Sequence, residues 1–227
     1  GTQALTDNTS GAQNTAVGSK ALDSNTTASN NTAVGYLSLF ANTTGTLNTA
    51  IGKGALDSNT TASDNTAVGG GAMEDNSTGT NNTAVGRTAL AANTTGSQNT
   101  ATGRNSLLSN TTATYNTGHG YQALAANTTG ASNTATGGNA LRSNTTASNN
   151  TAVGYVAGYS NTTGTVNTFI GRYAGYLNTT ASNNTMVGAS AGQNNTTGAQ
   201  NTAVGTDSLI SNTTANNNTA LGYQAGY

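Results

Sequence analysis

Hydrophobic and polar residues follow one pattern of 17 residues along the whole chain. The pentapeptide NTAVG occupies residues 14–18, and versions of it recur every 17 residues without an insertion. An Ala-Leu pair and the triplet NTT, followed by Gly or Ala, complete each copy. Positions that are equivalent in all copies form a column, named below after the residue at 14–30. The Asn of the pentapeptide recurs thirteen times, at Asn14, Asn31, Asn48, Asn65, Asn82, Asn99, Asn116, Asn133, Asn150, Asn167, Asn184, Asn201 and Asn218.

This pattern predicts an all-β fold. Gly, Asn and Thr are poor residues for helix interiors, and the apolar residues show no period of 3.6. Three constant segments separated by variable pairs predict a β-solenoid, that is, a parallel β-helix or β-roll of 17-residue coils. NTAVG is the clearest strand, AL a very short second side and NTT with Gly or Ala a third. Coils stacked at about 4.8 Å would place Asn on Asn and Thr on Thr.

The array fills residues 1–227 with about thirteen coils and no separate domains. At about 4.8 Å per coil it would be roughly 60 Å long. Solenoids usually carry atypical terminal copies, and none is visible here, so we expect a segment of a longer fibre.

The columns also predict which residues face inward. The Ala16, Val17, Ala21 and Leu22 columns are mostly small or aliphatic and are expected inside. Gly18 is glycine in every copy, which predicts a corner with positive φ or a close backbone approach.

Charge excludes several partners. Six Lys or Arg and seven Asp or Glu give a net charge of −1, and all of them fall in variable columns. No basic surface for nucleic acid and no apolar run long enough for membrane insertion is present. The chain has no Cys, so it has no disulfides and no thiolate metal sites.

Candidate catalytic chemistry is scarce. His119 is the only His, and it replaces an aliphatic residue of the pentapeptide. Asp64, Glu74 and Asp75 are predicted at different corners, and the glycines at 69–71 lack the Lys of a phosphate loop. We therefore predict no enzyme, no cofactor and no catalytic or metal-binding residue.

The NTT triplets form Asn-x-Ser/Thr sequons in every copy. One hypothesis is glycosylation of these asparagines, and the alternative is that Asn and Thr serve stacking and turn hydrogen bonds. The candidate residues are Asn8, Asn25, Asn42, Asn59, Asn76, Asn93, Asn110, Asn127, Asn144, Asn161, Asn178, Asn195 and Asn212.

The same side carries hydroxyls at alternate positions, as in Thr44 and Thr46 or Thr61 and Ser63. Period-2 spacing puts both on one face. Such a two-rank array resembles the ice-binding face of some antifreeze solenoids. The simpler interpretation is a solvated β face, and Ala12, Ala131, Ala199 and Asn216 interrupt the rank that contains Thr46 and Ser63.

Tyrosines gather in the last third, where Gly replaces Leu in the Leu22 column at Gly158, Gly175, Gly192 and Gly226. They could cover the gap left by the leucine, stack on sugars, or join neighbouring chains. Phe169 and Met186, in the Ala16 column, are further candidates for an apolar association surface. The candidate tyrosines are Tyr155, Tyr159, Tyr173 and Tyr176.

Residues 133–158, NTATGGNALRSNTTASNNTAVGYVAG, and 120–130, GYQALAANTTG, resemble the tandem repeats of bacterial and phage tail-fibre-domain proteins. NTAVG is also distantly similar to the head repeats of trimeric autotransporter adhesins. The resemblance implies a structural component of a fibre or filament, a spacer or scaffold or an adhesive element, outside the cell or on a cell or virion surface. Self-association and glycans are the expected partners, and ice binding is the alternative function.

Overall fold

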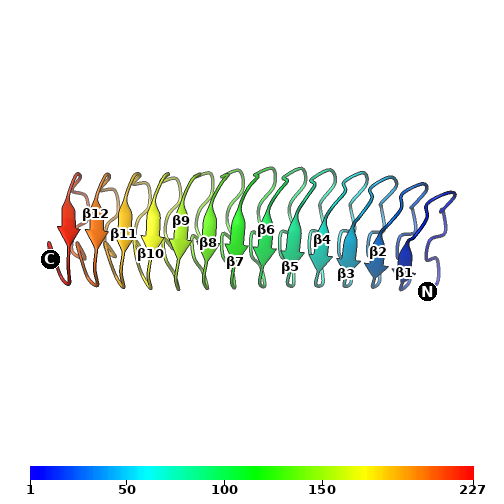
Figure 1. Ribbon diagram of the computed structural model, residues 1–227, viewed down its shortest axis with the longest axis horizontal. Coiled ribbons are helices and arrows are strands. Elements are labelled where there is room, and N and C mark those ends of the chain that lie inside the picture. Colours follow the sequence, from blue (N-terminus) through cyan, green and yellow to red (C-terminus); the bar gives the residue numbers. More distant parts are fainter. The chain divides into compact units, whose positions relative to one another are not determined.

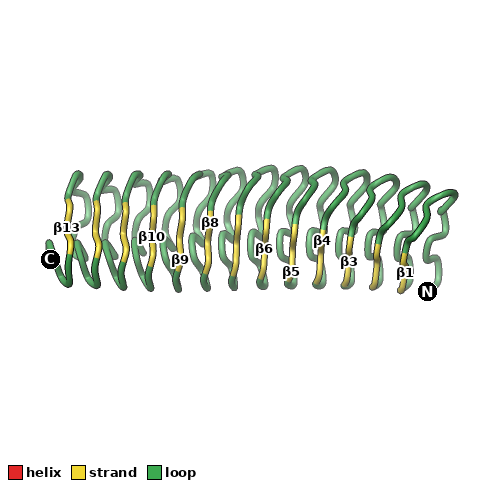
Figure 2. The backbone as a smooth tube through the Cα atoms, viewed as in Figure 1, coloured by secondary structure: helices red, strands yellow, loops and turns green.

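A computed structural model describes all residues 1–227 and shows an all-β chain. Each coil contributes one three-residue strand, and the rest of the coil is turn and loop (Figure 2). No helix of the length and apolarity needed to cross a membrane is found. The strands are β1 (Thr15–Val17), β2 (Thr32–Val34), β3 (Thr49–Ile51), β4 (Thr66–Val68), β5 (Thr83–Val85), β6 (Thr100–Thr102), β7 (Thr117–His119), β8 (Thr134–Thr136), β9 (Thr151–Val153), β10 (Thr168–Ile170), β11 (Thr185–Val187), β12 (Thr202–Val204) and β13 (Thr219–Leu221).

The coils fall into two compact units, Gly1–Tyr115 with β1 to β6 and Asn116–Tyr227 with β7 to β13. Within each unit every strand pairs in parallel with the next strand in the sequence (Figure 1). The register is an offset of one coil, so that Thr15 lies beside Thr32 and Ala16 beside Ala33. The predicted β-solenoid of 17-residue coils is confirmed.

Of the three predicted sides only NTAVG forms a strand. The AL and NTT segments are turns. In the AL segment the cause is the backbone, which takes positive φ at Lys20 (58°) and Leu22 (52°) and at the equivalent residues of the other copies; Asn30 (62°) does the same just before the next strand. An extended strand cannot continue through left-handed residues.

The turns are nevertheless bonded from coil to coil. Leu22 N–H donates to the carbonyl of Ser38 at 3.0 Å, and Thr26 N–H donates to that of Thr43 at 3.3 Å. The backbone is therefore paired along the stack on the turn sides as well as on the strand side, which satisfies buried polar groups without a second sheet.

Both reasons predicted for the invariant glycine hold. Gly18 has a φ of 134°, which disfavours any residue with a side chain. A Cβ atom there would lie 2.5 Å from the carbonyl oxygen of Gly35 in the next coil.

The strand alternates between interior and surface. Ala33 is buried while Thr32 and Val34 on either side are half-buried, and Val17 is 55% exposed. The expectation that the Val17 column points inward is thus wrong, because neighbours on a strand point to opposite faces. The interior is built from the Ala16, Ala21 and Leu22 columns, as in Ala33, Ala21 and Leu22.

Asparagine fills the rest of the interior. Asn76 Nδ2 donates to Asn59 Oδ1 at 3.0 Å and to the carbonyl of Gly79 at 3.0 Å. Asn76 Oδ1 in turn accepts from Asn93 Nδ2 at 2.8 Å. This Asn25-column ladder recurs within each unit, and because every amide is paired along it, the polar side chains can be buried.

A second ladder runs through the Asn14 column. Asn48 Nδ2 donates to the carbonyl of Ala62 at 2.8 Å and so closes its own coil. Its Oδ1 accepts from the backbone N–H of Asn65 at 3.1 Å and so joins the next coil. One side chain therefore closes a coil and also bonds it to the next coil.

Where the Leu22 column holds Gly in place of Leu, large residues in the Ala16 column can fill the space. Phe169 and Met186 are 0% and 1% exposed. A Cβ on Gly192 would lie 2.4 Å from Met186 Sδ, so the methionine takes that space. These two residues belong to the core, and their predicted role in an apolar association surface is wrong.

Candidate functional site

The sequon asparagines lie in the interior. Eleven of the thirteen, from Asn25 to Asn195, are 0% exposed, and Asn8 and Asn212 in the outermost coils are half-buried. In Asn42, Nδ2 already donates to Asn25 Oδ1 and to the carbonyl of Gly45. A glycan on that nitrogen would replace one of the two donated protons, and with it one of these bonds, and would have to enter a packed core. Glycosylation of these asparagines stays a hypothesis, and in the folded chain their amides make the stacking hydrogen bonds of its alternative.

The two ranks of hydroxyl groups on the NTT side differ in their exposure to solvent. Thr44 and Thr61 of the outer position are exposed. Thr46 and Ser63, two residues later, are half-buried, and Ser63 Oγ accepts the backbone N–H of Thr46 at 3.0 Å. The second rank is thus engaged in coil stacking.

The outer face of the strands carries a different array. Thr32, Thr49 and Thr66 are half-buried, and their hydroxyls make no hydrogen bond within the chain. Beside them run Val34, Ile51 and the other residues of the Val17 column. No Lys, Arg, Asp or Glu stands in either column. The result is a face of one hydroxyl rank and one mostly aliphatic rank, the latter interrupted at Thr102, His119 and Thr136.

The four candidate tyrosines form one contiguous cluster. Tyr155 and Tyr173 meet edge to face with centroids 6.1 Å apart, and Tyr173 and Tyr176 do so at 5.4 Å. Tyr159 stacks on Tyr176 at 5.3 Å. The four rings therefore pack mainly against one another, although Tyr155 stays 54% exposed.

Two arginines flank this tyrosine cluster. Arg142 Nη1 donates to Tyr159 Oη at 2.6 Å and its guanidinium lies 5.6 Å from that ring's centroid. Arg172 lies 4.8 Å from the centroid of Tyr173. The cluster is thus cationic at its edges and suits cation-π contact.

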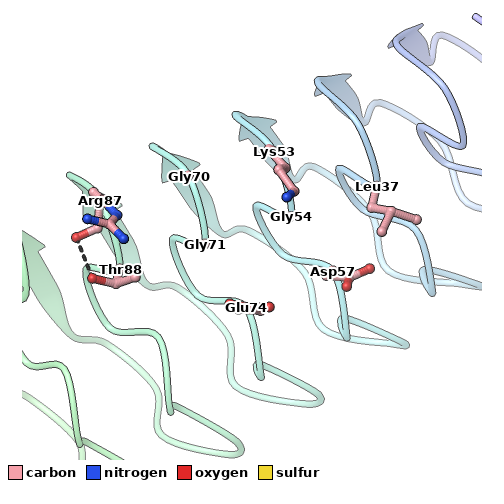
Figure 3. A pocket seen from close by; sticks show the side chains of 9 residues that line it. All are labelled: Leu37, Lys53, Gly54, Asp57, Gly70, Gly71, Glu74, Arg87 and Thr88. Carbon is pink, nitrogen blue, oxygen red and sulfur yellow. Dashed lines mark hydrogen bonds between the residues drawn. The ribbon is translucent and has the colours of Figure 1, made fainter.

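A notch with a volume of about 320 Å³ opens on the surface of the Gly1–Tyr115 unit. Lys53 and Arg87 lie along one side of it and Asp57 and Glu74 along the other, with glycines between (Figure 3). It is lined by Leu37, Lys53, Gly54, Asp57, Gly70, Gly71, Glu74, Arg87 and Thr88.

Missing side chains create the notch. The Lys20 column holds Leu37 and Thr88 at its two ends but Gly54 and Gly71 between them. A Cβ on Gly54 would meet no atom within 4 Å. Both glycines have a φ near 65°, which the same column accepts in residues with side chains, such as Thr88 at 52°. The backbone conformation therefore does not require glycine at these two positions.

The acidic side of the notch is electrostatically strained. Asp57 Oδ1 is buried and has no hydrogen-bond partner. Burial first, and then the negative charges of Glu74 and Asp75, raise the pKa of the Asp57 carboxyl above its ordinary value of 3.8.

Sequence reasoning missed this notch, although aligned copies carry its signal. Glycines occur in the Lys20 column of two consecutive copies, between charged residues in the Ser19 and Asp23 columns. His119 lies exposed on the outer face of β7 (Thr117–His119). No group of three His, Asp or Glu side chains is placed to hold a metal ion.

Comparison of the chain with protein-family models, with curated proteins and with solved structures finds no match.

Proposed function

We propose that the chain is a structural element of an extracellular fibre, acting as a spacer or scaffold. The supporting observation is the pair of buried asparagine ladders, which bond each coil to the next within each unit. A solenoid of this kind can lengthen by identical units without a growing core. The two asparagine columns do not vary between copies, and the charged residues are confined to outward columns.

Self-association is part of this proposal. Tyr155 remains exposed at the edge of the tyrosine cluster, and exposed aromatic residues are favoured in protein interfaces. Replacing Tyr155, Tyr159, Tyr173 and Tyr176 with Ser should lower the assembled mass. Tyr36→Ser is the control, because Tyr36 is 48% exposed but lies outside the cluster. A parent chain that sediments as a monomer at micromolar concentration would overturn this part.

The fibre role itself is tested by immunogold electron microscopy with an antibody raised against the folded chain. The proposal expects gold along filaments on the surface of the cell or particle that makes the protein. Gold distributed through the cell interior, with filaments unlabelled, would overturn it.

Ice binding remains the second candidate, favoured by the outer face of the strands. Its hydroxyls in the Thr15 column have no partner in the chain and repeat at the coil spacing of about 4.8 Å. Regularly repeated hydroxyl and aliphatic side chains can order water without charged groups.

A thermal-hysteresis assay tests this candidate. Substitution of Thr32, Thr49, Thr66 and Thr83 with Lys should abolish any arrest of ice growth by the parent. The control is the same change at Thr27, Thr44, Thr61 and Thr78, on the NTT side. No arrest by the parent, or equal loss in both variants, would eliminate the strand face as an ice-binding surface.

A further inference from the structure

The notch between Lys53 and Asp57 brings together unpaired charges of both signs. No ion pair within 4.0 Å joins Lys53 or Arg87 to a carboxylate. Asp57 Oδ1 lacks any partner, and Glu74 stands one coil further along the same side. The chain therefore leaves two cations and two anions facing a common space (Figure 3).

The space is large enough for a small molecule. Its volume of about 320 Å³ is at the lower end of the range of roughly 300 to 1,000 Å³ that is usual for small-molecule sites. Leu37 and Thr88 close its two ends, and Gly54 leaves the middle open, while a Cβ on Gly71 would lie 3.0 Å from Glu74 Oε2. Thr88 is held in place because its Oγ1 donates to Asn105 Oδ1 at 2.6 Å.

We propose that this notch binds a small zwitterion of the ω-amino acid class. The ammonium group would lie against the carboxylates of Asp57 and Glu74, and the carboxylate group against Lys53 and Arg87. Charge-assisted hydrogen bonds of this kind are stronger than neutral ones. A molecule with only one charge engages one side of the notch and leaves the other unpaired.

Both sides are needed because each is weak alone. Glu74 and Arg87 are exposed to water, and single exposed ion pairs contribute little. When one ligand forms both ion pairs, the entropic cost of binding is incurred only once, so the two pairs together bind more tightly than either alone. We therefore expect millimolar affinity for the zwitterion and about tenfold weaker binding of either singly charged analogue.

Nuclear magnetic resonance titration of the full chain with 4-aminobutyrate tests the proposal. The amide signals of Gly54, Gly70 and Gly71 report on the notch, and they should shift saturably. Acetate and methylammonium at the same concentrations should each be about tenfold weaker. Glycine and 6-aminohexanoate, which are shorter and longer, measure the span that the notch prefers. Gly138, which occupies the same column as Gly70 in the Asn116–Tyr227 unit, is the internal control and should not move.

Three variants separate the notch from general charge effects. Gly54→Asn with Gly71→Asn fills the middle, and it should fold because the column already holds Asn105 and Asn139 at φ 59°. Lys53→Gln with Arg87→Gln and Asp57→Asn with Glu74→Gln each remove one side. All three should lose at least tenfold in affinity for 4-aminobutyrate.

The proposal is overturned by any of three results. One is the absence of a saturable shift up to about 50 mM 4-aminobutyrate, well above the millimolar affinity expected. Another is an equal response to acetate or methylammonium alone. The third is unchanged binding by the filled Gly54→Asn, Gly71→Asn variant, provided that its circular dichroism matches that of the parent.

Discussion

Phe169 occupies the space that a leucine would need at Gly175, in the same coil. A Cβ atom on Gly175 would lie 2.2 Å from Phe169 Cδ1, and one on Gly158, in the preceding coil, would lie 2.6 Å from Phe169 Cδ2. One ring therefore fills the gaps left by two missing leucines. A larger residue in the Ala16 column thus compensates for smaller residues in the Leu22 column, and the interior stays packed.

Truncation of this ring should be costly. Phe169→Ala should lower the free energy of unfolding by about 3–5 kcal/mol, because neither glycine can fill the cavity. Gly175→Leu alone should also destabilise, by about 1–3 kcal/mol, through overpacking. The double variant should recover about 2 kcal/mol relative to Phe169→Ala. Urea unfolding measures all three, and strictly additive losses would show that the two positions do not share one space.

The Asn25-column ladder should be equally sensitive. Asn76→Ala leaves Asn59 Oδ1 and one proton of Asn93 Nδ2 unpaired in the interior. We expect a loss of about 2–5 kcal/mol in urea unfolding. Thr78→Ala, at an exposed side chain two residues away, should stay within about 0.5 kcal/mol of the parent. Similar effects of the two substitutions would contradict a stabilising role for the ladder.

Asp57 makes stability depend on pH. Its folded-state pKa is raised, so the folded chain holds this proton more tightly than the unfolded chain does. The free energy of unfolding should therefore fall as pH rises from about 4 through the folded pKa and level off above it. Asp57→Asn should remove this fall and stabilise the chain at pH 7. Asp23→Asn, in the same column, should leave the fall in place, and urea midpoints at pH 3, 5 and 7 decide between the outcomes.

Buried sequons should stay unmodified in the folded chain. Expression through a eukaryotic secretory pathway, followed by isolation of the folded fraction, should give no glycan on the eleven internal asparagines from Asn25 to Asn195, because their amides are enclosed. Peptide mass spectrometry checks each site. Folded material with full occupancy at Asn76, for example, would require a different packing of the NTT side.

The repeat was sufficient to predict the fold class. A period of 17 residues without insertions sets the length of each coil, and the invariant Gly18 column marks the same corner in every coil. The repeat could not predict how many sides are strands. Leu22 and Asn30 adopt positive φ although neither is glycine, and intrinsic propensity does not anticipate a left-handed leucine. Only stacking against the next coil, as in the bond from Leu22 N to Ser38 O, makes that conformation favourable.

The candidate sites were harder to predict for a related reason. Asn25 is a typical turn residue on its own, and its burial becomes favourable only when Asn8 and Asn42 lie above and below it. The tyrosine cluster was predicted as a group, but its edge-to-face contacts depend on ring orientations. The notch depends on what is missing at Gly54 and Gly71, which becomes visible only when neighbouring copies are compared.

Buried asparagine amides hold the coils in order within each unit. Hydrogen exchange of the Asn side-chain NH₂ groups, followed by nuclear magnetic resonance, measures how well these amides are enclosed. The Nδ2 protons of Asn59, Asn76 and Asn93 should exchange far more slowly than those of Asn149, whose residue is exposed. Equally rapid exchange at all four asparagines, in a chain that is folded by circular dichroism, would contradict the account.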